Sequence, residues 1–152
     1  MFSALLMLVA ITGLQDPALT HRGAMVMGFD QEKTAHHFLL YHDGGAIEVG
    51  VKGAADAKDR DAVRSHLPHI AMMFGEGKFD APMLVHDSTT VPGTTVMAAK
   101  KDAIQYRYED TPAGGRVSIT TTDPGALAAV HAFLRYQIAE HKTGAPTVPQ
   151  SR

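Results

Sequence analysis

The chain contains no cysteine among its 152 residues. Disulfide bonds, thiolate zinc sites and cysteine nucleophiles are therefore excluded, and a metal ion in this protein has to be held by His, Met, Asp or Glu. A charge excess is missing as well, since the formal net charge is -2 at pH 7 and the Lys and Arg residues are scattered along the chain. Because such a chain has no surplus of positive charge to neutralise phosphates, we expect no nucleic-acid partner.

Known catalytic signatures are also missing. The sequence has no Gly-x-Ser-x-Gly elbow, no Walker sequence, no Gly-x-Gly-x-x-Gly after a strand and no His-Glu-x-x-His. The run 88–90 and the pair His86-Asp87 offer hydroxyl and acid–base groups, but neither stands in the context that a nucleophile or phosphate loop needs. The sequence therefore leaves open whether this protein is an enzyme.

Long apolar runs are confined to the start of the chain. Residues 1–14 carry no charge and include the apolar run Phe2–Ile11, which is too short to cross a bilayer as a mature helix. This pattern predicts a signal peptide over 1–14 and an exported, periplasmic or secreted protein whose only membrane contact is the leader. A buried N-terminal helix is the alternative. Residues 15–28 show no clear period and are predicted to be a linker.

Beyond the linker, the pattern predicts a single α+β domain over 29–144, followed by a flexible tail over 145–152. Alternating runs flank glycine turns twice, which is typical of two β-hairpins. Helical spacing follows each hairpin, and Asp123 with Pro124 marks the start of the second helix. The expected elements are strands over 35–42, 46–52, 103–109 and 116–121, and helices over 57–75 and 124–142.

The order of these elements predicts a small antiparallel sheet of about four strands with two main helices on one face, in a pseudo-twofold hairpin-helix repeat. Residues 78–101 are expected to be mostly loop, with a short strand at 83–86 and a helical turn near 96–100. Pro68 lies inside the first of the two main helices and predicts a kink or a later start.

Nine histidines are the most informative residues that the chain does have. In the first hairpin His36 alternates with Phe38 and Leu40, so it should point toward the helices. The 3.6-residue period of the helices turns His66 and His131 toward the same layer. Three imidazoles from three elements predict a three-His metal centre of His36, His66 and His131. For each ring taken singly, a core histidine bonded to a carbonyl is the alternative.

Met27 precedes the first strand and is predicted to be a fourth ligand. Thioether and imidazole together suit copper, especially Cu(I), with zinc as the second choice and haem through one histidine as a third. The predicted function is an exported transition-metal-binding protein, with the metal ion as its partner. The alternatives are a metal-dependent enzyme, in which His86 or Asp87 transfers protons at an open metal position, and a structural or interaction domain without metal.

Several stretches carry a resemblance to a known family: 22–38, 64–67, 77–82, 85–86 and 129–141. Over residues 22–144 the chain resembles a family of small exported, mostly uncharacterised bacterial proteins. Members are sometimes labelled aspartate carbamoyltransferase, a label that the chain length and the lack of an arginine after Ser88-Thr89 do not support. The resemblance implies functional roles for one methionine and five histidines: Met27, His36, His66, His86, His131 and His141.

Overall fold

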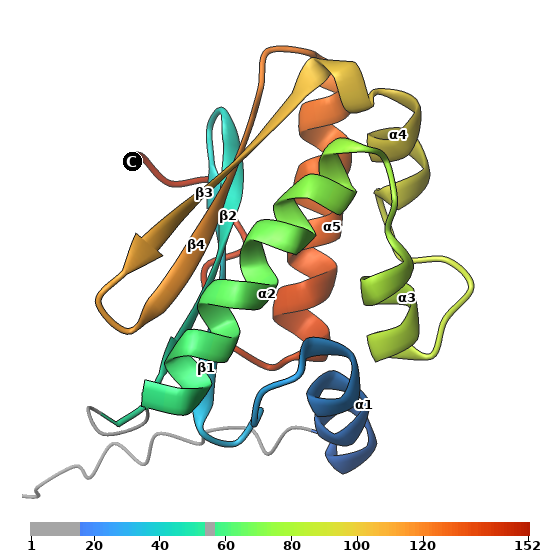
Figure 1. Cartoon of the computed structure of the whole chain (residues 1–152). Coiled ribbons are helices and arrows are strands. Elements are labelled where there is room, and N and C mark those ends of the chain that lie inside the picture. Colours follow the sequence, from blue (N-terminus) through green and yellow to red (C-terminus); the bar gives the residue numbers. More distant parts are fainter. Residues whose placement is uncertain (1–15, 54–56) are drawn as a thin grey trace, which may run out of the picture.

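The computed structural model describes residues 16–53 and 57–152, which form a layered α+β fold (Figure 1). A four-stranded antiparallel sheet in the order β1-β2-β4-β3 is covered on one face by helices, as the hairpin-helix pattern predicts. The predicted signal peptide over 1–14 lies outside the described residues. Within those residues, no helix is both long and apolar enough to span a membrane.

The first hairpin comprises β1 (Thr34–Tyr41) and β2 (Gly44–Val51). Its register sets Phe38 opposite Ile47 and His36 opposite Val49, and all four side chains are buried. Alternation therefore predicts the buried face of this hairpin correctly, His36 included.

The second hairpin, β3 (Ile104–Thr111) and β4 (Gly114–Thr121), joins the first through the central β2–β4 pair. There Ile47 lies opposite Val117, and both are buried. Gly45 lets the last helix approach the sheet closely, because a Cβ at this position would lie 2.2 Å from Leu134 Cδ1. The sheet is thus continuous beneath both main helices.

The two main helices are α2 (Ala57–Gly75) and α5 (Pro124–Glu140). Neither helix packs mainly on the hairpin that comes directly before it in the chain. Helix α2 covers β3 and β4, and α5 covers β1 and β2. The Asp123 side chain accepts the Ala126 N–H at 2.8 Å, which confirms the predicted helix start. Helix α2 begins where expected and continues through Pro68.

Three short helices lie outside this layer, on the side of α5 away from the sheet (Figure 1). They are α1 (Pro17–Met27), α3 (Asp80–His86) and α4 (Thr94–Ala99), and the 3-10 turn η1 (Lys101–Ala103) follows α4. One of them, α4, lies beside the N-terminal half of α5, and the other two, α1 and α3, lie near its C-terminal end.

Helices α1 and α3 correct two sequence predictions. Residues 17–27 are helical rather than a linker, and Asp16 caps α1 through the Ala18 N–H. Residues 83–86 belong to α3 rather than to a strand. A four-residue apolar run is too short for its period to separate the two states, so the flanking Asp80-Ala81-Pro82 helix start decides here.

The C-terminal residues, predicted to be a flexible tail, contact the β1 edge. The Gln150 N–H donates to the Leu40 carbonyl at 2.9 Å, and Arg152 pairs with Asp43 and lies 4.5 Å from the centroid of the Tyr41 ring. This edge of the sheet is therefore partly covered by the chain itself.

Candidate functional site

A small cavity of about 40 Å³ lies where the start of β1 meets the end of α5. Three imidazoles line it, those of His36, His86 and His141, together with the Met27 thioether and the Gln137 amide. The rest of its lining is apolar and comes from these residues: Phe38, Ile47, Leu67, Ile70, Phe74, Ala81, Pro82, Val85 and Phe133. The cavity is therefore a nitrogen and sulfur site inside an apolar shell.

Four separate elements supply the cavity's functional groups. His36 lies in β1, His86 ends α3, and Met27 ends α1. His141 is the C-cap residue of α5, and its N–H donates to the Gln137 carbonyl at 3.0 Å. Because the site needs all of these elements docked together, it depends on the tertiary fold and not on one local motif.

The three imidazoles form a row with His141 in the middle. The ring centroids of His36 and His141 lie 5.7 Å apart, and those of His86 and His141 lie 5.2 Å apart. Two imidazoles on one ion, with metal–nitrogen bonds of about 2.0 Å, have ring centroids at most about 6 Å apart. Both observed separations fall within that limit, so neighbouring rings in the row are close enough to share an ion.

Hydrogen bonding defines the state of the His86 ring. Its Nε2 lies 2.9 Å from Gln137 Oε1, an acceptor, so Nε2–H is the donor, and in the neutral form of the ring Nδ1 carries the lone pair. Nδ1 is buried without a hydrogen-bond partner among the described residues, and Glu140 Oε2 lies 4.0 Å away, beyond hydrogen-bond distance. An oriented imidazole whose other nitrogen donates to a fixed acceptor is the usual arrangement of a metal-ligating histidine.

The His36 ring is also incompletely bonded. It is 7% exposed, and its Nε2 has no hydrogen-bond partner in the described part of the chain. The ring stacks between Phe29 and Phe38, with centroid separations of 6.0 and 6.4 Å. A buried polar atom without a hydrogen-bond partner lowers the free energy of unfolding by about 1–3 kcal/mol, so a polar ring at this position requires an explanation.

Burial keeps these rings uncharged. Burial, with smaller contributions from the nearby His37, Lys52 and His66, lowers the pKa of His36 to about 4. Burial, with smaller contributions from His36 and His86, lowers the pKa of His141 to about 3. At neutral pH both imidazoles are neutral, which is the form that binds metal ions.

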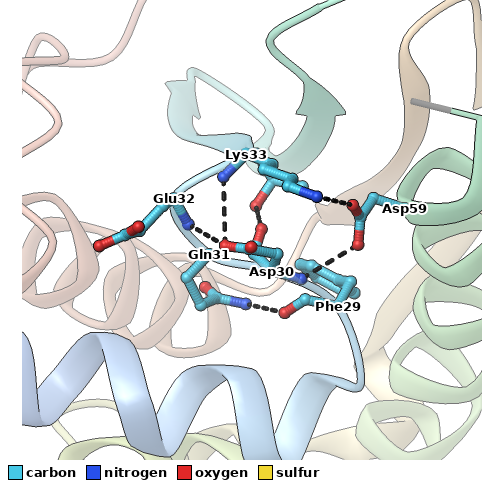
Figure 2. Close-up of polar contacts among 7 residues, drawn as sticks. Phe29, Asp30, Gln31, Glu32, Lys33 and Asp59 are labelled. Carbon is cyan, nitrogen blue, oxygen red and sulfur yellow. Dashed lines mark hydrogen bonds and ion pairs between the residues drawn. The ribbon is translucent and has the colours of Figure 1, made fainter. Parts of the chain in front are cut away.

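The loop between α1 and β1, which follows Met27, is linked to α2 by polar contacts (Figure 2). The Asp59 carboxylate, on α2, accepts the Asp30 N–H at 3.2 Å and pairs with Lys33 Nζ at 3.7 Å. Asp30 in turn accepts the Glu32 N–H at 2.8 Å. This network links the loop to α2 and holds Phe29, which stacks on His36.

The structure does not bring the predicted ligands His36, His66 and His131 together as one centre. His131 Nε2 lies 2.9 Å from the Tyr41 carbonyl and 3.0 Å from the Gly44 carbonyl, at the other end of β1 from His36. Ten residues separate His131 from His141, or about 15 Å along a helix. The distance is too long for His131 to share an ion with the His36–His141 pair.

His66 lies closer to the cavity but is not among its lining residues. Its ring meets the edge of Phe29 with centroids 6.0 Å apart, and burial, together with a smaller contribution from His69, lowers its pKa to about 4. Of the four predicted ligands, the cavity therefore includes Met27 and His36.

The cavity adds two histidines that are absent from the predicted ligand set. Periodicity places His141 on the same stripe of α5 as His131, whereas His86 falls in the segment predicted to be a strand and is offered by the sequence as a proton-transfer residue; the family resemblance implies roles for both. As the side chains stand, no three His, Asp or Glu residues in the described ranges 16–53 and 57–152 are arranged to hold a metal ion. Metal binding at the cavity therefore requires the rings to turn.

Comparison with known proteins gave no match. No protein-family model matches the chain, and no curated protein and no solved structure is significantly similar to it. The functional argument therefore depends on the residues of the cavity itself.

Proposed function

We propose that this protein is an exported transition-metal-binding protein, for which copper is the preferred ion and zinc the second choice. The ligands are His36, His86 and His141, with Met27 as a thioether ligand. The observation that carries the proposal is a small cavity lined by three imidazoles and one thioether, in which His36 Nε2 and His86 Nδ1 are buried and have no hydrogen-bond partner among the described residues.

The donor types support this ion class. Neutral imidazole suits copper and zinc, whereas the thioether favours copper. No carboxylate lines the cavity, which argues against calcium or magnesium because those ions require oxygen ligands. The export part of the proposal depends on the apolar sequence over 1–14.

Binding requires side-chain rotation and little backbone movement. Neighbouring centroids in the imidazole row are already 5.2 and 5.7 Å apart, so turning the rings about their side-chain bonds can direct two nitrogens at one ion. The ion would then join α1 and α3 to β1 and α5. The protein would hold, deliver or sequester this ion.

Metal content of untagged protein tests the proposal. Wild type, His36→Ala, His86→Ala, His141→Ala and His131→Ala are loaded with copper or zinc, desalted and analysed for bound metal, with circular dichroism as the folding check. His37→Ala is the matched control, because His37 lies next to His36 on β1 and is exposed.

We expect the wild type, His37→Ala and His131→Ala to retain one ion per chain. We expect the three cavity variants to lose most of it. A wild type that retains no ion, or a loss in His37→Ala as large as in the cavity variants, contradicts the proposal. An equal loss in His36→Ala and His131→Ala would restore the ligand set that the sequence predicts.

A further inference from the structure

The charge of the cavity restricts which oxidation state it accepts. We infer that the site selects monovalent copper, Cu(I), over the divalent ions Cu(II) and Zn(II); this inference rests on the proposed metal site. Three features favour the monovalent ion: the charge of the ligands, the polarity of their surroundings and the number of ligands within reach.

None of the four ligands brings a negative charge. Met27 is a neutral thioether, and His36, His86 and His141 are neutral ligands when they bind a metal ion. An ion bound here therefore keeps its full charge: one unit for Cu(I), two for Cu(II) or Zn(II). Thiolate and carboxylate ligands, which reduce the net charge of many divalent sites, are absent from the cavity lining.

The surroundings provide little compensation for a second charge. Nine of the fourteen lining residues are apolar residues other than methionine, and the one amide, that of Gln137, has its oxygen 2.9 Å from His86 Nε2. Glu140 is the carboxylate that approaches the row of rings, 4.0 Å from His86 Nδ1, but it lies outside the cavity lining and its side chain is 47% exposed.

Electrostatics favours the lower charge in such a place. The cost of moving an ion from water into a weakly polar interior rises with the square of its charge, and for a single charge it is already several kcal/mol. Nothing in the lining offsets the additional cost of a divalent ion. A soft monovalent ion meets a smaller cost and gains more from the thioether.

The number of available ligands points the same way. Zinc sites in proteins are nearly always tetrahedral with four ligands, whereas Cu(I) is satisfied by fewer soft donors. No three His, Asp or Glu side chains of the described residues are arranged to hold an ion together. A pair of neighbouring imidazoles with the Met27 sulfur needs less rearrangement than a four-ligand zinc centre.

Anaerobic competition titrations test this inference. Untagged wild type, Met27→Leu and the control Met72→Leu, whose methionine is 51% exposed on α2, are titrated with Cu(I) and Ag(I) against a chromogenic chelator. Zn(II) and Cu(II) are titrated in parallel. Ag(I) is the monovalent probe that cannot change oxidation state under these conditions.

We expect Cu(I) and Ag(I) to bind at least about a hundredfold more tightly than Zn(II), as a difference of several kcal/mol requires. Met27→Leu should weaken Cu(I) binding by about tenfold or more, because it removes the soft ligand, and leave weak zinc binding unchanged. Met72→Leu should change neither affinity.

Three results contradict the inference, and each is distinguishable from the others. Zn(II) or Cu(II) bound as tightly as Cu(I), and lost in His36→Ala, would leave the proposed metal site standing and remove its selectivity. No binding of any of the four ions would remove both the site and its selectivity. Equal weakening in Met27→Leu and Met72→Leu would remove the role of the Met27 thioether.

Discussion

His131 and His36 occupy opposite ends of the layer between the sheet and α5, and their surroundings differ. Both rings are nearly inaccessible, at 8% and 7% exposed. His131 Nε2–H has two backbone carbonyls within hydrogen-bond distance, whereas His36 Nε2 has no hydrogen-bond partner in the part of the chain that the structure describes, and its ring stacks on His141. Burial alone does not distinguish a structural histidine from a binding one. The difference lies in whether the protein itself satisfies the ring nitrogens.

The first prediction concerns the stability of these two ends. His131→Leu should lower the free energy of unfolding by about 3 kcal/mol, because it removes the hydrogen-bond donor facing the Tyr41 and Gly44 carbonyls and leaves them buried. His36→Leu should change it by less than about 1 kcal/mol, because an apolar side chain replaces an incompletely bonded polar ring. Urea denaturation of the metal-free proteins measures both values.

His37→Ala serves as the surface control and should stay within about 0.5 kcal/mol of wild type. If His36→Leu destabilises as strongly as His131→Leu, the two ends are equivalent structural histidines, and the contrast drawn here is wrong.

The second prediction is a pH dependence that comes from the His36 end. The folded-state pKa of His36, about 4, lies below the ordinary histidine value of 6.5, so between these two pH values the unfolded chain binds more protons than the folded chain. The stability contribution is complete above pH 6.5 and is lost as the pH falls toward 4, by about 3 kcal/mol for this ring. His66 and His141, whose folded-state pKa values are lowered to about 4 and about 3, act in the same direction.

Urea midpoints of metal-free protein between pH 7 and pH 4 measure this loss. His36→Leu should show a smaller loss than wild type over the same range, since one of the depressed groups is gone. Identical pH profiles for the two proteins would show that the His36 ring is solvated or paired in the folded state.

The third prediction is the smallest and concerns Gln137. Its Oε1 accepts from His86 Nε2–H and so orients the ring. Gln137→Ala should weaken copper binding by about tenfold, the lower end of the range for partners that orient metal-ligating histidines. Competition titration with a chelator measures this change. Ala128→Ser, at an exposed position of the same helix, is the control and should leave the affinity unchanged. Unchanged affinity in Gln137→Ala would indicate that His86 is not a ligand.

Sequence patterns predict this fold well where they fix the orientation of side chains. Alternation correctly places His36 with Phe38 on the covered face of the sheet, and the Asp123-Pro124 signal marks the start of α5. The same signal, Asp16-Pro17, starts α1. Residues 16–28 nevertheless lack a clear apolar period, and for that reason the sequence predicts a linker there. The short apolar run in α3 was ambiguous for a related reason, because four residues do not complete two turns.

The predicted site is less complete because periodicity gives the face of a helix but not the height along it. His131 and His141 lie on the same stripe of α5, and nothing in their spacing tells which of them meets His36. Antiparallel packing of β1 and α5 decides in favour of His141. His86 is absent from the predicted ligand set because its segment is predicted to be a strand, and no local pattern shows that α3 docks near the end of α5.

Each hairpin is covered by the helix that follows the other hairpin, and this arrangement determines what happens when the chain is cut between the two halves. If the chain is cut at the exposed Thr89, each fragment keeps a hairpin but loses the helix that packs mainly on it. Neither fragment should be ordered alone, but when the two are mixed each hairpin should again be packed against its helix. The proposed ligands are divided too, with Met27, His36 and His86 on one fragment and His141 on the other. Copper uptake would then report reassembly, so the protein would work as a two-piece reporter of its own association.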